Sequence, residues 1–474
     1  MTSPASEPTY DYDLLVIGSG PAGHRAAIQA AKLGKRVAVV ERRAEVGGVC
    51  LHTGTIPSKT LRQAALRFSG YHEHANNGVA LEASPPVSMK DMLARVGQVL
   101  RNEIEVARDQ LRRNGVQVIA ATASFVDPHT VRVVYVDGSG SKDVRARFVV
   151  IAVGTSTTRD AHIPFDGTRI FTSDDILHME VLPKTLAVVG AGVIGLEYAS
   201  IFTALGVRVT IVDKYPALLP FVDREILDAL VYHLRERRAT MRFGETVQAI
   251  EVVKDEQGER VRIALASGKQ VSAERVLYSI GRTGATEGLG LEAAGLTADD
   301  RGRIPVDERY RTAQPHVYAV GDVIGFPSLA STSMEQGRIA ACDAFGKSHR
   351  AVQGLFPYGV YTVPGISMVG KNEEELTKAG IPYEVGRAQY KEIARGQILG
   401  DPTGLLKILF HRETRKILGV HIIGVEAAEL VHIGQAVMAF EGTIDYFVDT
   451  VFNYPTLAEC YKTAAFDGVN RLAN

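Results

Sequence analysis

One order of hydrophobic runs, glycines and alanine-rich sequence occurs twice along the chain. In the first copy, the apolar run 14–17 is typical of a buried strand. A glycine cluster and an alanine-rich helical segment follow, and then a second apolar run at 37–40. In the second copy, apolar runs at 186–189 and 207–212 flank a similar glycine cluster and helical segment. The repeat predicts two βαβ units and therefore an α/β fold.

The sequence outside the repeat is less regular. Residues 59–114 have a helical pattern that is interrupted near Pro85 and Pro86, and strand-rich sequence follows. A break within 347–357 opens a C-terminal part that combines strands in 404–424 with a helix over 426–440. We therefore expect two Rossmann-like dinucleotide-binding domains and a C-terminal α+β domain.

Composition narrows the class of protein. The 474 residues are 46% hydrophobic and 23% charged, with a formal net charge of -1, so neither nucleic acid nor a membrane is an expected partner. The three cysteines exclude a disulfide framework and favour a reducing compartment, and the polar first twelve residues lack the features of a signal peptide. We expect a cytoplasmic protein. The histidines have no metal-ligand spacing, so no metal is expected.

Each glycine cluster has the features of a phosphate-binding turn. The first is Gly18-Ser19-Gly20-Pro21-Ala22-Gly23, and Glu41 ends the following strand, where its carboxylate can accept hydrogen bonds from a ribose. The second is Gly190-Ala191-Gly192-Val193-Ile194-Gly195, with Asp213 in the equivalent place. The helix N-terminus after each turn offers free N–H groups to phosphates. The alternative is a glycine turn without a ligand. Two such sites favour hydride transfer between a nicotinamide and a flavin.

The order of these and other motifs resembles the flavoprotein disulfide reductases, such as dihydrolipoamide dehydrogenase and glutathione reductase. The shared stretches are IGSGPAG, GGVC with GTIPSKTL, VVIAVGTS, VVGAGVIGLEYAS, GRTGAT, VYAVGDV and NYPTLAE. The resemblance implies an FAD-binding domain in two segments, 1–153 and 280–348. It also implies an NAD(P)-binding domain at 154–279 and a dimerisation domain at 349–474, hence a homodimer.

The resemblance also implies the binding residues. Those expected around FAD, besides the first cluster, are Glu41, Arg42, Gly48, Val49, Cys50, Ser58, Lys59, Gly154, Gly321, Asp322, Leu329 and Ala330. Those expected around NAD(H) or NADP(H), besides the second cluster, are Glu197, Asp213, Lys214 and Gly281. Lys59 is expected near flavin N5 and paired with Glu197; the alternative is an ordinary helix lysine and a surface carboxylate.

Two departures from the family pattern bear on catalysis. The family's redox disulfide is a C-x4-C pair, but here Cys50 is followed by Thr55. The family's acid–base histidine is replaced by Tyr454, whereas the accompanying glutamate remains as Glu459. One subfamily, the soluble pyridine nucleotide transhydrogenases, is similar in both features. The residues expected at the reaction site are Lys59, Glu197, Thr55 and Glu459.

We therefore expect FAD-dependent, ping-pong hydride transfer between NADPH and NAD+, with NADP+ and NADH in the reverse direction and no redox-active disulfide. Alternatives are a flavin-dependent oxidase or quinone reductase, and a lipoamide dehydrogenase-like or purely FAD-binding protein without reductase activity. Asp213 favours a free 2′-hydroxyl, and Lys214 could offset this with a charge for a 2′-phosphate. The alternative is NAD(H) preference with Lys214 in solvent. Cys50 is expected to have a structural or vestigial role.

Overall fold

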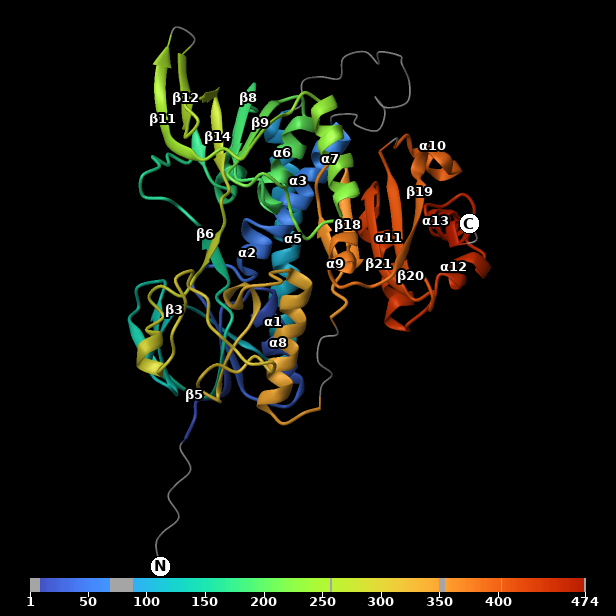
Figure 1. Ribbon diagram of the computed structural model, residues 1–474. Coiled ribbons are helices and arrows are strands. Elements are labelled where there is room, and N and C mark those ends of the chain that lie inside the picture. Colours follow the sequence, from blue (N-terminus) through green and yellow to red (C-terminus); the bar gives the residue numbers. More distant parts are fainter. Residues whose placement is uncertain (1–8, 69–87, 256–257, 349–353, 402, 473–474) are drawn as a thin grey trace, which may run out of the picture. The chain divides into compact units, whose positions relative to one another are not determined.

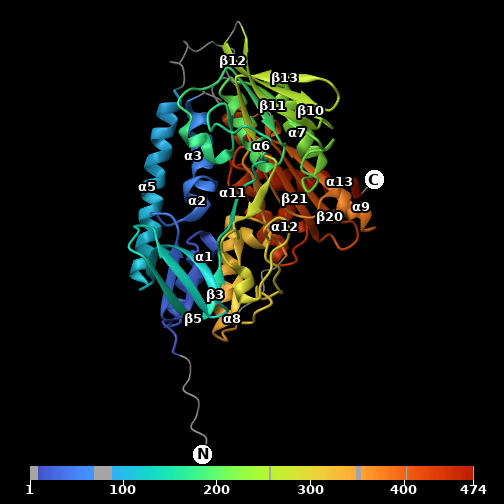
Figure 2. The ribbon, with the colours of Figure 1, turned by 90° about the vertical axis from the view of Figure 1, so that its left-hand side faces the viewer.

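The computed structural model describes residues 9–68, 88–255, 258–348, 354–401 and 403–472. Contacts divide the chain into two compact units, one of Met1–Ser58, Ala94–Thr158 and Gly281–Gln353, the other of Lys59–Leu93, Arg159–Ile280 and Gly354–Asn474. The predicted interruption at Pro85 and Pro86, the first eight residues and part of the predicted break at 347–357 lie outside the described residues. Figures 1 and 2 show the chain from two directions.

The first unit alternates strands and helices. Its elements are β1 (Tyr12–Ile17), α1 (Pro21–Lys32), β2 (Val37–Glu41), α2 (Gly48–His52), β3 (Gln117–Asp127), β4 (Thr130–Tyr135), β5 (Ser141–Ile151), β6 (Thr155–Thr157), β15 (Arg282–Gly284), β16 (Val317–Ala319) and α8 (Ala330–Ala344). Short 3-10 turns cover Leu291–Ala294 and Gly321–Ile324. Helices α3 (Thr55–Phe68) and α5 (Met89–Arg113) contribute residues to both units.

A parallel sheet organises this first unit. The strands β3, β2, β1, β5 and β16 pair in that order, and β4 pairs antiparallel with the outer parts of β3 and β5. Helices α1 and α8 pack side by side, as both views show. A Cβ at Gly337 in α8 would lie 2.0 Å from the carbonyl oxygen of Ala22 in α1, so only glycine permits this approach.

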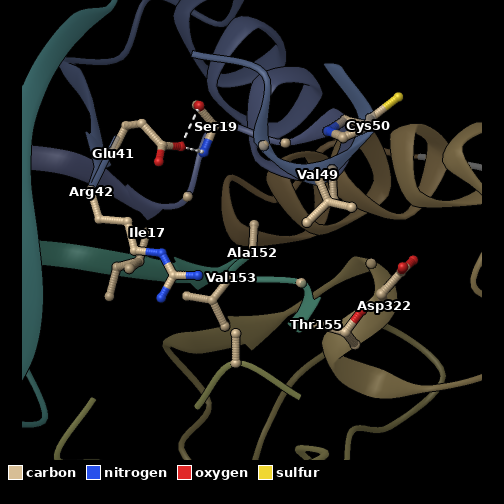
Figure 3. Close-up of a pocket in the computed structure, with 18 of the residues that line it drawn as sticks. Ile17, Ser19, Glu41, Arg42, Val49, Cys50, Ala152, Val153, Thr155 and Asp322 are labelled. Carbon is tan, nitrogen blue, oxygen red and sulfur yellow. Dashed lines mark hydrogen bonds between the residues drawn. The ribbon is translucent and has the colours of Figure 1, made fainter. Parts of the chain in front are cut away.

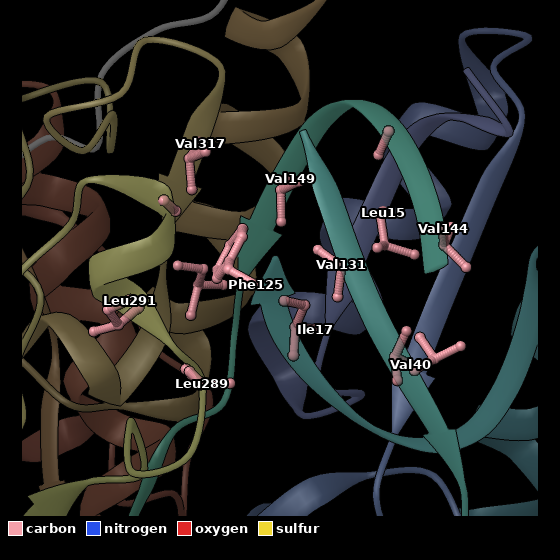
Figure 4. Packing of buried hydrophobic residues seen from close by; sticks show 14 of the residues in the cluster. Leu15, Ile17, Val40, Phe125, Val131, Val144, Val149, Leu289, Leu291 and Val317 are labelled. Carbon is pink, nitrogen blue, oxygen red and sulfur yellow. The ribbon is translucent and has the colours of Figure 1, made fainter. Parts of the chain in front are cut away.

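Strand β1 is buried on both faces, as its continuous apolar run predicts. Leu15 and Ile17 face one cluster, which includes Val40, Phe125 and Val149 (Figure 4). The alternate residues of β1 face a second cluster together with α1. The two clusters hold the strand ends, and thus the turn after β1, in a fixed position.

The second unit contains the second copy of the repeat. Its elements are β7 (Ile170–Phe171), β8 (Thr185–Val189), α6 (Val193–Ala204), β9 (Arg208–Asp213), α7 (Arg224–Glu236), β10 (Thr240–Phe243), β11 (Val247–Asp255), β12 (Gly258–Leu265), β13 (Gln270–Ala273) and β14 (Arg275–Tyr278), with a 3-10 turn at Ser173–His178. Strands β10, β9, β8, β14 and β7 form a parallel sheet, and β11, β12 and β13 form an antiparallel one.

The C-terminal part of the second unit has a different architecture. Its elements are β17 (Tyr358–Val360), β18 (Gly365–Gly370), α9 (Glu373–Lys378), β19 (Tyr383–Gln389), α10 (Ala394–Leu399), β20 (Leu405–His411), β21 (Ile417–Gly424), α11 (Ala427–Ala439), α12 (Asp445–Asp449) and α13 (Glu459–Leu472), with a 3-10 turn at Tyr390–Glu392. The antiparallel order is β17-β18-β21-β20-β19, and α11 and α13 pack on this sheet.

The predicted fold class is confirmed: two Rossmann-like βαβ units and a C-terminal α+β part are present. Strand β9 begins at Arg208, one residue later than predicted. The helix predicted over 426–440 is α11, Ala427–Ala439, because Glu426 has a φ of 57° and does not continue the helical conformation.

Candidate functional site

The first glycine cluster forms a tight turn between β1 and α1. Gly18 has a φ of 101°, and a Cβ there would lie 2.4 Å from the carbonyl oxygen of Ala152 on the neighbouring strand. Gly20 is the N-cap of α1 and Pro21 occupies the first helical turn, where a missing N–H is tolerated. A Cβ on Gly20 would find only Gly48 Cα, at 4.0 Å, so the N-terminus of α1 faces open space that a phosphate could occupy.

Glu41 fixes this turn from the end of β2. Its side chain is buried, and its Oε2 accepts hydrogen bonds from Ser19 N–H at 3.0 Å and Ser19 Oγ–H at 2.5 Å. Its Oε1 accepts from Arg43 N–H at 3.0 Å, and Gly47 N–H donates to Ser19 Oγ at 2.9 Å. A carboxylate has about four acceptor positions. At least one therefore remains for a ligand hydroxyl.

A cavity of about 440 Å³ opens in front of this turn. Figure 3 shows Glu41 and Asp322 well apart along its wall, so an elongated ligand would meet a carboxylate near each end. Of the residues expected around the first dinucleotide, those that line the cavity are Gly18, Ser19, Gly20, Pro21, Ala22, Glu41, Arg42, Gly48, Val49, Cys50, Gly154, Gly321, Asp322 and Ala330. Thr55 also lines it. The glycine turn, the open helix N-terminus and the two carboxylates fit a dinucleotide.

Four expected residues do not line this cavity: Gly23, Ser58, Lys59 and Leu329. A Cβ on Gly23 would lie 1.9 Å from the Gly18 carbonyl oxygen, so this glycine serves the packing of helix on strand. Ser58 donates its hydroxyl to the Thr55 carbonyl oxygen at 3.2 Å, within α3. Leu329 is the N-cap residue of α8.

The sequence patterns missed other lining residues. These are Ile17, Val40, Arg43, Ala121, Thr122, Ala123, Ala152, Val153, Thr155, Ala285, Glu287, Gly288, Leu289, Val320, Ser328 and Ser333. Ala121 is found through strand register, because Glu41 pairs with Ala120 across β2 and β3. Ala285 lies within the shared stretch GRTGAT, but no motif covers residues 287–289, so these offered no signal of their own.

Burial in this cavity disfavours the charged form of the Asp322 carboxylate. Burial raises its pKa above the ordinary value, against the opposing effects of the Arg282 charge and a hydrogen bond from Ser333. Asp322 lies in the short 3-10 turn that follows β16, at the end of the parallel sheet. Hydroxyl donors from a bound ligand would stabilise its charged form. The position therefore suits a polyhydroxyl ligand chain.

The sulfur chemistry of the cavity rests on one cysteine. Cys50 in α2 and Thr55 at the start of α3 both line the wall. The three cysteines, all within the described residues, form no disulfide with one another. Cys460 is buried, and burial together with the charge of Glu459 raises the pKa of its thiol to about 12. Cys460 is therefore a protonated, unreactive thiol at neutral pH.

The second glycine cluster repeats the design of the first within the second unit. Asp213, at the end of β9, accepts Ala191 N–H on Oδ2 at 2.5 Å and Tyr215 N–H on Oδ1 at 2.8 Å. A Cβ on Gly192 would meet nothing within 4 Å, so the N-terminus of α6 also faces open space. The Lys214 ammonium lies 5.0 Å from the centroid of the exposed Tyr215 ring.

Gly281, the remaining expected contact of the second nucleotide, belongs to the segment that re-enters the first unit. Its carbonyl oxygen accepts a hydrogen bond from Thr158 N–H at 3.1 Å. A role for Gly281 in nucleotide binding stays a prediction.

Lys59 and Glu197 form the expected ion pair. Lys59 lies in α3, one helical turn after Thr55, and Glu197 lies in the first half of α6. Lys59 Nζ is 2.7 Å from Glu197 Oε2, and the side chains are 27% and 6% exposed. Residues four apart on a helix share a face, so Lys59 follows Thr55 along the side of α3.

The position of the family's acid–base pair has a different arrangement. Tyr454 is 72% exposed. The Oε2 atom of Glu459 is buried and makes no hydrogen bond within the described residues. Tyr454 and Glu459, at the positions of the His–Glu pair, are therefore not joined by a hydrogen bond in the described part of the chain.

Among the residues that the structure describes, one group of carboxylates has metal-like spacing: Asp223, Glu225 and Glu373. Its centre is taken by the ammonium of buried Lys407, which lies 2.9 Å from Asp223 and 3.1 Å from Glu225 and also contacts Glu373. The lysine supplies the positive charge that these carboxylates need.

Among the described residues, no helix combines the length and apolar character needed to cross a membrane.

Two glycine turns, each before a helix and each backed by a strand-end carboxylate, define an oxidoreductase that uses dinucleotides. A pattern described as "Pyridine nucleotide-disulphide oxidoreductase" matches residues 12–337, and one described as its dimerisation domain matches residues 356–465. The chain belongs to this family of flavin- and nicotinamide-dependent oxidoreductases.

Its relatives narrow the subfamily. A soluble pyridine nucleotide transhydrogenase of Mycobacterium tuberculosis (strain ATCC 25177 / H37Ra) is 50% identical over 463 residues, covering 98% of each chain. A protein of the same name from Azotobacter vinelandii is 48% identical over 469 residues, covering 98% of this chain and 99% of the relative. Among solved structures, LpdA from Mycobacterium tuberculosis has a TM-score of 0.87 at 28% identity, covering 96% of this chain and 99% of that chain. RclA from Escherichia coli, a flavoprotein disulfide reductase, has a TM-score of 0.86 at 27% identity with the same coverage.

Proposed function

We propose that the protein transfers a hydride between NADPH and NAD+, and between NADH and NADP+ in reverse, in a ping-pong cycle through bound FAD. No redox-active disulfide takes part. The two relatives named soluble pyridine nucleotide transhydrogenase support this proposal. The observation that carries it is Thr55, which lines the first cavity where the family pattern has the second cysteine of its redox pair.

A threonine in this place removes the usual exit for electrons. Its hydroxyl cannot form a disulfide with Cys50 and cannot supply a nucleophilic thiolate. Cys460 is no substitute, since burial holds its thiol in the protonated form. Electrons that enter the site therefore need an acceptor that comes to the flavin itself, and a second nicotinamide dinucleotide is such an acceptor.

The first cavity is the proposed FAD site. The N-terminus of α1 would hold the pyrophosphate, Glu41 the ribose of the adenosine, and Asp322 the polyhydroxyl chain. When bound there, flavin supplies a ring that accepts a hydride from one nicotinamide and returns it to another. The chain's own task is to hold and orient both partners and to exclude water.

The Lys59–Glu197 pair supplies charge for this transfer. Reduction adds negative charge to the flavin ring, and a fixed ammonium would stabilise that charge. Glu197 holds the Lys59 ammonium in one place, through a 2.7 Å contact at a buried carboxylate. Lys59 lies one helical turn after Thr55 on the same helix, α3, and this supports the proposed role.

Hydride transfer also explains the lost acid–base pair. A hydride carries two electrons and one proton together, so its passage between two nicotinamides requires no net proton exchange with water. A thiol–disulfide reaction, in contrast, needs a proton carrier. Tyr454 is exposed, and Oε2 of Glu459 makes no hydrogen bond to the described part of the chain; both are consistent with a reaction that has no such requirement. Glu459 is accordingly proposed as a remnant of the pair and not as a proton carrier.

The turn of the second glycine cluster is the proposed site of the nicotinamide dinucleotides. Asp213 is held by two backbone N–H groups and faces the ribose position, which favours NAD(H). Exposed Lys214 offers a point charge for the 2′-phosphate of NADP(H), which lets the same pocket accept both cofactors. Ala191 N–H is already committed to Asp213, so the phosphates would be held by the remaining N–H groups of the α6 N-terminus.

A homodimer through the C-terminal part completes the proposal. This part matches the family's dimerisation domain, and it exposes large apolar side chains: Phe440 at 88% and Val451 at 89%. Apolar surface of this kind is typical of an interface with a second copy of the chain. The low cysteine count favours the cytoplasm as the site of the reaction.

The decisive experiment is turnover of NADPH with thio-NAD+ under nitrogen, with purified yellow protein. We expect formation of thio-NADH at a rate that air does not increase. Consumption of NADPH that depends on oxygen or added quinone would instead support an oxidase or quinone reductase. Failure of NADPH to bleach the flavin would support a purely FAD-binding protein, and reduction of lipoamide would contradict the absence of a sulfur relay.

A further inference from the structure

The Lys59–Glu197 pair has a third member from the C-terminal part of the second unit. The backbone N–H of Tyr361, one residue after β17, donates to Glu197 Oε1 at 2.8 Å. The ring of the same tyrosine lies under the ammonium, with Lys59 Nζ 4.8 Å from the ring centroid. The ammonium is therefore held between a carboxylate oxygen and an aromatic ring, and the carboxylate is itself fixed by the backbone of the aromatic residue.

The neighbours of Tyr361 are bonded to the same two helices. Val363 N–H donates to Ser200 Oγ of α6 at 2.9 Å, and Arg62 Nε of α3 donates to the Thr362 carbonyl oxygen at 2.8 Å. Thr362 and Val363 are buried. These bonds fix the backbone on the C-terminal side of Tyr361. The backbone therefore sets the direction of the tyrosine side chain independently of the contacts of its ring.

The preceding strand, β17, leaves room for the ring. A Cβ on Gly359 would lie 3.1 Å from a ring carbon of Tyr361, so glycine at this position leaves the room that the ring uses. Within the described residues, the Tyr361 hydroxyl has no recorded hydrogen bond. The feature with a clear partner is thus the ring face and not the phenol oxygen.

Tyr361 stays neutral in this environment. Burial raises the pKa of its hydroxyl, and the negative charges of Glu197 and Glu429 raise it further against the opposing charge of Arg62. A neutral ring attracts an ammonium through its quadrupole. A free lysine side chain populates many rotamers, which the ring restricts.

We propose that Tyr361 is a positioning residue for hydride transfer, whose ring holds the Lys59 ammonium in the orientation that the reaction uses. This rests on the proposed function, in which Lys59 supplies charge to the flavin. Tyr361 acts through Lys59 and does not itself touch the reacting atoms.

The test is the anaerobic rate at which NADPH bleaches bound flavin, measured by stopped flow in holoenzyme and normalised to flavin content. Tyr361→Phe keeps the ring and should stay within about twofold of the wild type. Tyr361→Leu removes it and should be slower by about 2- to 30-fold, the range of cation–π interactions converted to rate. If the leucine variant fails to retain flavin, Tyr361→Met replaces it. Tyr358→Leu, three residues earlier, is the matched control and should not change the rate.

A double-variant comparison separates positioning from a structural effect. In a Lys59→Met background, Tyr361→Leu should cause no further loss, because there is no ammonium left to hold. The same loss in both backgrounds, or equal slowing by phenylalanine and leucine, would overturn the proposal. If Lys59→Met alone reduces at the wild-type rate, the proposed role of Lys59 fails. If Lys59→Met slows flavin reduction but the Tyr361 variants reduce flavin at the wild-type rate, the role of Tyr361 fails and that of Lys59 stands.

Discussion

The assignment of FAD to the first glycine turn and of the nicotinamide dinucleotides to the second can be tested by one conservative substitution at each. Glu41→Gln and Asp213→Asn both replace a carboxylate oxygen with an NH2 group and change little in size. Each carboxylate accepts hydrogen bonds from protein N–H groups on both oxygens. An amide can satisfy only one side, so in each variant one backbone donor faces another donor.

The expected effect of Glu41→Gln on stability and FAD binding follows from the hydrogen bonds at the first turn. Glu41 is buried and accepts three hydrogen bonds. Loss of one charge-assisted bond costs about 1.5–3 kcal/mol, which lowers the melting temperature of a domain of this size by about 3–12 °C. Loss of a comparable bond to the ribose weakens FAD by about 10- to 150-fold. NAD(P)H binding to flavin-loaded protein should be unchanged.

The paired variant should show the opposite pattern. Asp213→Asn is expected to retain FAD at the wild-type level and to weaken NADH by about 10-fold or more. FAD retention is measured by flavin absorbance after gel filtration, and nicotinamide binding by titration of flavin bleaching. Loss of FAD in the Asp213 variant together with full retention in the Glu41 variant would refute the assignment of the two sites.

Three further changes test other parts of the site. Lys214→Ala should raise the KM for NADPH several-fold more than that for NADH, and equal effects would remove Lys214 as a phosphate contact. Thr55→Cys should restore at most a disulfide with Cys50, detected by thiol titration, with little lipoamide reduction unless Tyr454→His is added; efficient reduction by the single variant would contradict the role given to Tyr454. Asp322→Asn should weaken FAD yet leave the apoprotein at least as stable at pH 7. Burial raises the folded pKa of this carboxyl, so its cost is full above that pKa and disappears as the pH falls towards about 4. A stability gain that is independent of pH would argue against this cause.

The sequence predicts the local parts of this site well, for a physical reason. A glycine turn, the helix after it and the acidic strand end are encoded within one βαβ unit, so their residue types report their geometry directly. Strands β2 and β8 and helix α11 were predicted to within about one residue for the same reason. The glycines at the first turn also have the backbone conformation and close contacts that the motif implies.

Contacts that depend on register or on packing between distant segments could not be predicted in this way. Ala121 lines the first cavity because β3 pairs with β2, and residues 287–289 line it because the chain returns after residue 280. The ring under Lys59 comes from residue 361, and the cation among three carboxylates comes from Lys407 on β20. Each of these partners is unremarkable in its own sequence neighbourhood, and only the folded chain identifies it.

The distribution of hydrogen bonds follows the needs of the proposed reaction. Glu197 uses both carboxylate oxygens, one on Lys59 and one on the Tyr361 backbone, so the partner of the Lys59 charge is fixed on both sides. Glu459, which belongs to the proton-transfer pair of the family pattern, has a buried oxygen without a hydrogen bond in the described residues. A disulfide reductase needs the proton-transfer pair that includes Glu459 held as firmly as Glu197, because thiols must gain and lose protons. An enzyme that transfers a hydride needs only the fixed charge of the Lys59–Glu197 pair. That difference in fixation, together with Thr55, supports the proposed transfer between dinucleotides over sulfur chemistry.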